Sequence, residues 1–349
     1  MKKVRVFIGR MSPLHIGHCE TIKKAADGAD LLIIIIGSAY RSRNLKNPFT
    51  YDDRRKILEK WIKQDPSLAG KIVIQPMEDQ PDNVAWLAKV QKIVKQFTSV
   101  AQMDGSKSEI EIVCSSKEEE TSYPFWFKNW KPIVVPALMN GEEFLSATYI
   151  RDIYFNINAS DEDAHCFLPE TTIEFLKKFR ESDEWKSLQQ EYEFIKAYKK
   201  SWEAAPFPPI FLTTDAVVVQ SGHLLVIKRK GNPGKGLVAL PGGFLNQNER
   251  IIDGCIRELR EETGLKVPDK VLRGSIAGFE IFDDPARSER GRTVTNAYFF
   301  KLADHVDLPH VRGEDDAEKA WWMPLQEVYE CRDQFYEDHF MIVSKFISF

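Results

Sequence analysis

Apolar residues in the first half of the chain form short runs that are separated by segments of helical periodicity. Residues 4–8 form the first run, and the second, ADLLIIIIGSAY at 29–40, has no polar alternation. Such a run is typical of a strand that is covered on both faces. Further strands are predicted at 71–77, 109–116 and 131–138, with helices at 16–27, 52–64, 82–98 and 146–157. This alternation predicts an α/β domain with a doubly wound parallel sheet.

The periodicity changes over residues 169–204, where two helices are predicted. The second carries a stripe of large apolar side chains, Trp185, Leu188, Tyr192, Ile195 and Trp202, which predicts packing against a neighbouring domain. PFPP at 206–209 ends helical structure. Short strands and one clear helix, at 249–263, follow. We therefore predict a first domain over 1–182, a helical connector over 183–209 and an α+β domain over 210–349.

Composition narrows the class of protein. A net charge of −4 over 349 residues gives no basic bias for nucleic acid or an anionic membrane. No run of about 18 apolar residues could span a bilayer. The five cysteines are far apart and never form CxxC, which argues against a disulfide framework or a zinc site. We expect a cytoplasmic protein; the sequence leaves its subunit number open, and a homo-oligomer is compatible with it.

The first candidate site is FIGRMSPLHIGH, from Phe7 to His18, which leaves the first predicted strand and enters a helix. A turn of this kind leaves backbone N–H groups at a helix N-terminus, where they attract phosphate. Gly9 and Gly17 allow close approach of the backbone to a ligand. His15 and His18 can donate hydrogen bonds to phosphate oxygens and stabilise a leaving pyrophosphate.

The HxGH pattern at the end of the first strand resembles the nucleotidylyltransferase superfamily, which shares it with class I aminoacyl-tRNA synthetases. SATYIR at 146–151 resembles the late Ser-x-Thr-x-x-Arg motif of the transferases. That resemblance implies that Arg151 reaches the nucleotide triphosphate and that Thr148 adds a hydroxyl donor. A synthetase would need a tRNA-binding apparatus and a KMSKS-type loop, and neither is found.

Within that superfamily the chain resembles the archaeal-type nicotinamide mononucleotide adenylyltransferases. The similar stretches are GRMSPLHIGH with Arg10, NPFTYDDR at 47–54, and DQPDNVAW at 79–86. The resemblance implies that Asn83 binds the carboxamide and that Trp86 stacks on the pyridine ring, although Trp86 taken alone could be a core residue. Lys46 stands where the family often has Arg, and it cannot fork onto a phosphate. The alternative is a transferase that uses another acceptor of the AMP group, for instance phosphopantetheine, in place of nicotinamide mononucleotide.

The second candidate site is GGFLNQNERIIDGCIRELREETGL at 242–265, which fills every fixed position of the Nudix box and resembles the Nudix hydrolases. One helical face collects the apolar residues Ile251, Ile252, Cys255, Ile256 and Leu259. Gly264 is placed to end the helix. Arg257 is predicted to orient a glutamate, and Glu249 to be a metal ligand or a structural partner.

Three glutamates of the box, Glu258, Glu261 and Glu262, are three or four positions apart and are predicted to share one face. Carboxylates so close repel one another unless a hard divalent cation, Mg²⁺ or Mn²⁺, lies between them. The predicted metal ligands are these glutamates and Gly242. Glu261 and Glu262 are also the predicted catalytic residues of this domain.

Two later stretches, 283–300 and 313–328, resemble the ADP-ribose pyrophosphatase branch of the Nudix enzymes. Arg287, Arg290 and Arg292 are candidates for contacts to substrate phosphates, and the alternative for each is a merely exposed side chain; Arg287 and Arg292 are the predicted site residues. A general base is expected in the acidic loop, where four carboxylates remain as candidates: Glu314, Asp315, Asp316 and Glu318. Arg54 and Arg55 in the first domain are expected to be solvated helix residues or helix-dipole partners rather than catalytic groups.

The whole chain resembles bacterial fusions of these two domains. The resemblance implies that ATP and nicotinamide mononucleotide give NAD and pyrophosphate, and that ADP-ribose is cut to AMP and ribose 5-phosphate. Two alternatives concern the second domain: it could act on another nucleoside diphosphate derivative, or it could be an ADP-ribose sensor. A sensor of this kind carries a DNA-binding module and tends to lose the box glutamates. No such module is found here, and the glutamates are intact.

Overall fold

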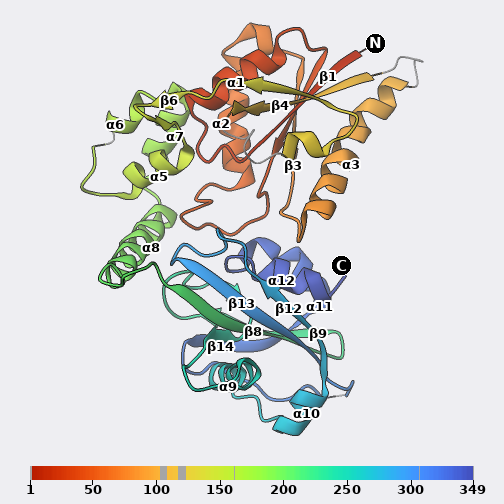
Figure 1. Cartoon of the computed structure of the whole chain (residues 1–349), viewed down its shortest axis with the longest axis vertical. Coiled ribbons are helices and arrows are strands. Elements are labelled where there is room, and N and C mark those ends of the chain that lie inside the picture. Colours follow the sequence, from red (N-terminus) through yellow and green to blue (C-terminus); the bar gives the residue numbers. More distant parts are fainter. Residues whose placement is uncertain (1, 103–107, 117–122, 161, 306, 349) are drawn as a thin grey trace. The chain divides into compact units, whose positions relative to one another are not determined.

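The computed structural model describes residues 2–102, 108–116, 123–160, 162–305 and 307–348 (Figure 1). Its contacts divide the chain into two compact units, Met1–Gln189 and Gln190–Phe349. Each unit has its own sheet and its own hydrophobic core. The predicted connector contains the helix α8 (Asp183–Lys200), and the division between the units falls within that helix.

A five-stranded sheet in the order β3-β2-β1-β4-β5 forms the first unit. All four neighbouring pairs are parallel, which confirms the doubly wound sheet predicted from the sequence. The strands are β1 (Lys2–Gly9), β2 (Leu31–Ile36), β3 (Ile72–Pro76), β4 (Ser108–Ser115) and β5 (Lys131–Val135). Almost all of β2 is buried, as its unalternated apolar run predicts.

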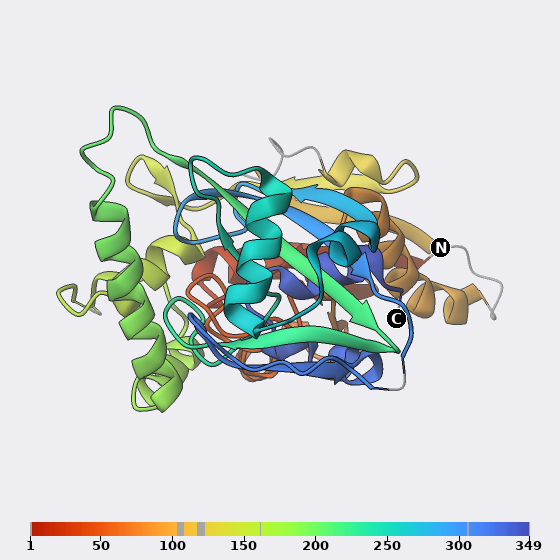
Figure 2. The same ribbon diagram turned by 90° about the horizontal axis from the view of Figure 1, so that it is seen from below.

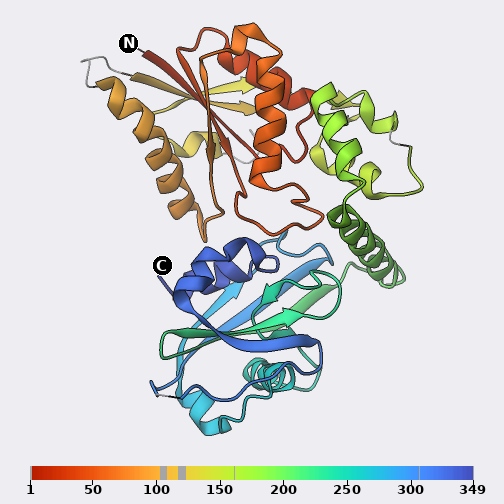
Figure 3. The same ribbon diagram turned by 180° about the vertical axis from the view of Figure 1, so that it is seen from behind.

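Helices cover both faces of this sheet (Figure 3). Successive side chains of a strand point to opposite faces. Ile34 of β2 therefore packs with α1 (Ile16–Ala26) and α2 (Tyr51–Lys63), whereas Ile33 packs with α3 (Asn83–Gln102). The β1–α1 connection leaves the sheet at the carboxyl ends of its strands, which is where α/β sheets bind ligands.

The rest of the first unit is mainly helical. A hairpin of β6 (Met139–Asn140) and β7 (Glu143–Phe144) follows β5 and was not evident in the sequence pattern. The helices after it are α5 (Ala147–Phe155), α6 (Glu162–His165) and α7 (Glu170–Phe179), and two 3₁₀ turns occur at Pro66–Leu68 and Tyr123–Trp126. Trp185 of α8 stacks on Phe155 in this unit, whereas Trp202 packs edge-on against Phe211 in the second.

A seven-stranded mixed sheet forms the second unit, with the order β10-β9-β8-β13-β12, β11 paired to β8 and β14 paired to β9. The pair β8–β13 is parallel and the others are antiparallel. The strands are β8 (Ile210–Gln220), β9 (His223–Arg229), β10 (Val238–Ala239), β11 (Gly242–Phe244), β12 (Ile276–Phe282), β13 (Arg292–Lys301) and β14 (Ala317–Pro324). This arrangement confirms the predicted C-terminal α+β domain.

Alternate residues of β8 point to the two cores of this sheet. Ala216 and Val218 pack against the helix α9, which lies across the strands in Figure 2, whereas Val217 packs with the C-terminal helix α12. The helices are α9 (Ile251–Thr263), α10 (Asp269–Gly274), α11 (Leu325–Glu330) and α12 (His339–Phe346), with a 3₁₀ turn at Arg332–Gln334.

Two further observations bear on the expectations from composition. All five cysteines are free thiols. Within the described ranges, no helix is both long enough and apolar enough to cross a bilayer.

Candidate active sites

The loop that leaves β1 opens into a cavity of about 290 Å³ in the first unit. Seven of the predicted residues line it: Gly9, Arg10, His15, Gly17, His18, Thr148 and Arg151. The early motif on β1–α1 and the late motif on α5 therefore meet at one site, although they are far apart in sequence. A Cβ added to Gly9 would make only ordinary contacts, the nearest at 3.6 Å from Phe7.

The two histidines lie against each other at the N-terminus of α1. Their ring centroids are 3.8 Å apart, and the rings are tilted by 34°. The N–H of His15 donates to Nδ1 of His18 over 3.4 Å, so in a neutral His18 ring the proton is on Nε2. A Cβ on Gly17 would lie 3.0 Å from the ring of His15. A side chain at position 17 would therefore crowd the ring of His15.

Arg151 connects the late motif to the early one. Its Nη1 donates to the carbonyl oxygen of Ser12 over 2.8 Å, and its Nη2 donates to Oγ1 of Thr148 over 3.1 Å. The side chain of Ser146 caps α5 by accepting the N–H of Tyr149. Arg151 is buried, whereas Thr148, which lines the same cavity, is exposed. The guanidinium is thus held rigidly beside the β1–α1 loop.

Arg54 is buried, so the expectation that it is a solvated helix residue is wrong. Its guanidinium donates to four carbonyl groups, those of Thr50, Arg10, Gly37 and Ser38, at 2.8–3.2 Å. Burial lowers its pKa to about 10. A basic residue in the first turn of a helix is unfavourable for the helix dipole, and this is the signal that could have indicated a specific partner. Arg55 is exposed and pairs with Glu59.

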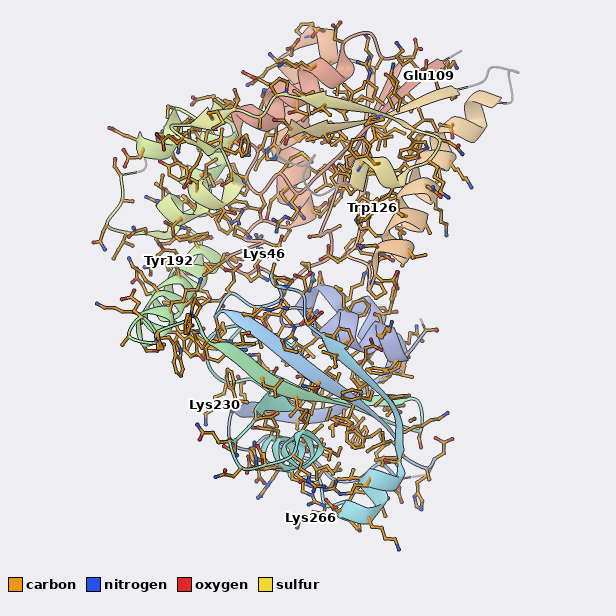
Figure 4. All side chains as sticks on the ribbon, in the orientation of Figure 1. Lys46, Glu109, Trp126, Tyr192, Lys230 and Lys266 are labelled. Atoms are coloured by element: carbon orange, nitrogen blue, oxygen red, sulfur yellow. The ribbon has the colours of Figure 1, made fainter. Side chains whose placement is uncertain are left out.

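Three predicted residues of the first unit, Lys46, Asn83 and Trp86, do not line this cavity. Lys46 (labelled in Figure 4) contributes to the electrostatic environment of Asp79. Asp79 was not a predicted site residue; it accepts hydrogen bonds from Ser38 at 2.9 Å and from Arg41 at 2.6 Å. Burial would raise the pKa of Asp79, but these cationic and hydroxyl partners lower it overall. Asp79 therefore holds the segment that contains Ser38 and Arg41 beside residues 79–86.

Trp86 is half-buried on the first turn of α3, where Asn83 is exposed. Its ring meets Tyr123 edge-on at 5.6 Å between centroids and is tilted against Phe127 at 6.0 Å. Packing therefore accounts for part of the Trp86 surface. Contact of these two residues with a nicotinamide group stays a prediction.

In the second unit, Arg257 is the centre of a charged network on α9. It binds both carboxylate oxygens of Glu249, at 2.7 and 3.0 Å, and its Nη1 donates to Glu258 and Glu261, each at 2.8 Å. The Arg257 hydrogen bonds lower the pKa of Glu249 to about 2. These contacts agree with an orienting role for Arg257, and they favour the structural reading of Glu249.

The three predicted metal-binding glutamates differ in their surroundings. Glu262 is 4% exposed and accepts the N–H of Gly242 over 2.8 Å, and burial raises its pKa to about 8. Burial also raises the pKa of Glu258, whereas Glu261 is exposed. Both glycines of the motif are close-packed: a Cβ on Gly242 would lie 2.2 Å from the carbonyl oxygen of Thr214, and one on Gly243 would lie 2.7 Å from Glu258.

The three glutamates are neighbours on α9. Glu258 and Glu262 lie one turn apart with raised pKa values, and Glu261 shares Nη1 of Arg257 with Glu258. Among the residues that the structure describes, no three acidic, histidine or cysteine side chains form a ready-made metal cluster. The oxygen donors fit a hard divalent cation in kind, because a nearby positive charge would favour the ionised form of the buried Glu262 and the partly buried Glu258.

The acidic loop lies beside the C-terminus of α9. The N–H of Arg312 donates to the carbonyl of Thr263 at 2.9 Å, and that of Glu314 to the carbonyl of Glu262 at 3.1 Å. Gly264 ends the helix in the left-handed conformation, with φ of 62°, as the sequence predicts. The carboxylate of Glu314 is bound by Arg312, and that of Glu318 by Lys228. The loop therefore adjoins the box, but its contacts do not single out one base.

Two of the arginines predicted at substrate phosphates are held by protein groups. Arg287 is buried, and its fork binds both carboxylate oxygens of Asp338, at 2.8 and 2.9 Å. This placement corrects the prediction of substrate contact, because the charge of the buried guanidinium is paired with a buried carboxylate inside the unit. Arg292 is partly exposed and donates to the carbonyl of Asp283, and Arg290 lies over the ring of Phe244.

The two parts of the chain match two different family models. Residues 6–153 match the Cytidylyltransferase-like family, and residues 210–345 match the NUDIX domain. A nicotinamide/nicotinic acid mononucleotide adenylyltransferase from Acinetobacter baylyi is 32% identical over 189 residues, which cover 54% of this chain and 92% of that protein. An ADP-ribose pyrophosphatase from Methanocaldococcus jannaschii is 31% identical over 117 residues, or 34% of this chain and 63% of that protein.

Two solved structures match 99% of the chain, both of a bifunctional NMN adenylyltransferase/ADP-ribose pyrophosphatase from Francisella tularensis. One of them holds AMP and a manganese ion. The sequence identity is 32%, the TM-score is 0.88, and the match covers 99% of this chain and 98% of that one.

Proposed function

Since the chain belongs to the family of bifunctional NMN adenylyltransferase/ADP-ribose pyrophosphatases, we propose that it makes NAD at one site and hydrolyses ADP-ribose at the other. The transferase is assigned to residues 1–182 and the hydrolase to 210–349, with 183–209 as the connector. The single observation that carries the first assignment is the cavity in which the early and late motifs meet. The proposed place of action is the cytoplasm, in keeping with free thiols.

In the transferase, a phosphate oxygen of nicotinamide mononucleotide attacks the α-phosphorus of ATP. A new P–O bond forms as the bond to pyrophosphate breaks, so the protein's task is positioning and charge neutralisation. The Nε2–H of His18 is proposed to donate to the departing phosphates. Arg151, fixed by Ser12, is proposed to bind the triphosphate without having to reorganise.

The cavity lined by His15, His18 and Arg151 is proposed to hold the phosphates and is called the phosphate cavity. The nicotinamide end is proposed to bind outside it, near residues 79–86. Asn83 is exposed at the start of α3 and can bond a carboxamide. The part of Trp86 that Tyr123 and Phe127 leave open can stack on a cationic pyridinium ring, for about 1–2 kcal/mol. Lys46 supplies a positive charge near the same segment.

In the hydrolase, the proposed substrate is ADP-ribose, and the proposed cation is Mg²⁺ or Mn²⁺, held by Glu258, Glu262, Glu261 and Gly242. When bound, such a cation neutralises a pyrophosphate and activates water. The N–H of Gly242 orients the carboxylate of Glu262, and Nη1 of Arg257 binds the carboxylates of Glu258 and Glu261. A carboxylate of the loop at 313–318 is proposed to take the proton from the attacking water, because that loop adjoins the C-terminus of α9.

The first experiment separates the two chemistries by single substitutions. Glu262→Gln should reduce ADP-ribose hydrolysis by about 10²–10⁴-fold, because it removes one charge of the cation site at nearly constant volume. His18→Ala should reduce NAD formation by about 10²–10³-fold, because a donor to the leaving group is lost. Each variant should keep the other activity and the melting temperature of the wild type.

Matched controls lie outside the sites. His165→Ala changes a half-buried histidine that does not line the phosphate cavity, and Glu330→Gln changes an exposed glutamate of α11. Both should behave as wild type. A folded His18→Ala or Glu262→Gln protein that lost both activities would replace two independent sites with one composite site.

A substrate panel tests the choice of ADP-ribose. The protein should cleave ADP-ribose faster than NAD, nucleoside triphosphates or diadenosine polyphosphates, each measured with Mg²⁺ and with Mn²⁺. If ADP-ribose ranked low, the hydrolase would act on another nucleoside diphosphate derivative, and the Nudix assignment itself would stand.

A further inference from the structure

The segment that carries Gly242 to the cation site is fixed at three successive residues. The N–H of Leu240 donates to Nδ1 of His339 over 3.0 Å, and the carbonyl of Pro241 accepts the N–H of Ala216 over 2.8 Å. The N–H of Gly242 then donates to Oε2 of Glu262 over 2.8 Å. Because proline has no N–H, Leu240 and Gly242 provide the only two backbone donors of this segment.

The bond to His339 replaces a strand partner. Strand β10 ends at Ala239 and β11 begins at Gly242, so Leu240 lies in the gap between two paired strands. Leu240 is buried, and a buried N–H without an acceptor costs about 1–3 kcal/mol. The ring of His339 is itself buried and supplies the acceptor. Burial lowers the pKa of His339 and so favours the neutral ring, in which Nδ1 can accept.

The other edge of the His339 ring faces the strand that pairs with Gly242. Nε2 lies 4.0 Å from Oδ1 of Asp215, and Asp215 is the register partner of Gly242 between β8 and β11. Oδ2 of Asp215 accepts the hydroxyl of Thr295 over 2.6 Å, which fixes the carboxylate. A Cβ on Gly242 would lie 2.6 Å from Oδ1 of Asp215, so the two residues are in close contact.

The backbone of His339 is held by the buried pair of Arg287 and Asp338. Asp338 is the N-cap position of α12, yet its carboxylate makes no capping bond and binds the Arg287 fork instead. His339 is the next residue and the first of the helix. The bidentate pair therefore fixes the start of α12, and with it the position of the imidazole.

We propose that His339 is a positioning residue of the hydrolase site, which holds Leu240 and thereby aims the Gly242 N–H at Glu262. The inference rests on the proposed function, because it treats Glu262 as a ligand of the cation. It also gives Arg287 a role through His339 in place of direct contact with substrate. Groups that orient a metal ligand typically affect metal affinity by about 10–100-fold when they are removed.

The experiment compares three substitutions of His339 by their affinity for Mn²⁺ alone, measured from the electron paramagnetic resonance signal of the free ion. Asn places an acceptor at nearly the distance of Nδ1 from the backbone, whereas the Gln amide reaches the position of Nε2. Ala removes both. We expect Ala and Gln to raise the Kd for Mn²⁺ by about tenfold or more and Asn to stay within about threefold of wild type.

Steady-state kinetics with saturating Mn²⁺ give the second measurement. In the Ala and Gln variants, kcat for ADP-ribose should fall about tenfold or more, while KM should change less than about twofold. NAD formation should be unchanged in all three. His223→Gln is the matched control, since His223 also makes one backbone contact but lies in the part of β9 that pairs with β8 and the end of β14.

The outcomes are distinguishable. Wild-type affinity in His339→Ala, or equal rescue by Gln and Asn, would overturn the inference. If Ala did not fold, the comparison of Asn with Gln would decide. If the wild type bound Mn²⁺ through Glu262 but did not cleave ADP-ribose, the proposed substrate would fail and the Mn²⁺ series would still decide this inference. Binding of Mn²⁺ that did not depend on Glu262 would overturn it.

Discussion

The guanidinium of Arg151 donates a hydrogen bond to the carbonyl oxygen of Ser12 over 2.8 Å, although the two residues are 139 positions apart in the chain. Ser12 belongs to the loop after β1, and Arg151 to α5. A second donor of the same guanidinium reaches Thr148. The guanidinium thus joins the loop after β1 to α5 and forms part of the wall of the phosphate cavity.

Arg151→Lys should therefore reduce NAD formation by about 10²-fold or more, because an ammonium group cannot reproduce the two directed bonds of the fork. Hydrolysis of ADP-ribose should not change. Initial rates of both reactions, with melting curves, check this expectation. The control is Arg55→Lys on the exposed side of α2, and a near-normal rate in Arg151→Lys would exclude the fork from transition-state binding.

Trp86→Ala should raise the KM for nicotinamide mononucleotide about tenfold, and that for ATP much less, because a stacking surface worth about 1–2 kcal/mol is removed. Trp126→Ala is the matched control, since Trp126 (Figure 4) is a tryptophan of the same unit that is 38% exposed and lies outside residues 79–86. Steady-state kinetics with each substrate varied in turn give the measurement. Equal effects on both KM values would remove Trp86 from the nicotinamide pocket.

Arg54→Met should lower the free energy of unfolding of the first unit by about 2–4 kcal/mol, because four backbone carbonyls lose a charged donor. The lowered pKa of Arg54 shows that burial of the cation offsets part of its gain. The neighbouring Arg55→Met removes an exposed ion pair and should melt as wild type. Urea titrations of the two variants check the difference, and identical midpoints would contradict it.

Glu191→Gln tests a buried carboxyl of α8. Its Oε2 accepts the N–H of Gly234 over 2.8 Å, and burial raises its pKa above the ordinary value. A raised folded-state pKa stabilises the second unit while the group is protonated, and that stabilisation is lost as the pH rises through the folded pKa. Gln keeps an acceptor without a charge, so the variant should be more stable than wild type near pH 8.

The advantage of Glu191→Gln should shrink as the pH falls toward about 5. Urea unfolding followed by hydrogen–deuterium exchange of peptides from the second unit, corrected for the intrinsic effect of pH, measures it. Glu203→Gln changes an exposed glutamate of the segment after α8 and should have no effect. A variant that was less stable than wild type at both pH values would contradict the sign of the shift.

The sequence predicted most of the first unit because its signals are local. The apolar run of β2 and the HxGH turn each identify an element and its place in a parallel sheet. The predicted helices begin and end within a few residues of α1, α2 and α5. The short β6–β7 hairpin was missed because two-residue strands carry no periodicity.

The residues that the sequence did not reveal act through partners far along the chain. Arg287 binds Asp338, 51 positions away, and His339 binds Leu240, 99 positions away. No local pattern records such pairs, because an arginine in a polar loop looks the same whether it faces a substrate or a buried carboxylate. Arg54 alone carried a local signal, since a cation at a helix N-terminus needs a compensating partner.

The bond between Glu191 and Gly234 limits how the hydrolase could be separated from its fusion partner. A fragment that begins at residue 210, where the family match begins, would leave the Gly234 N–H without its acceptor and Phe211 without the rings of Tyr198 and Trp202. In recombination between genes, an exchange at that point would transfer the whole NUDIX match without the residues of α8 and the segment after it that pack against it. A viable junction for swapping the hydrolase would fall before Glu191.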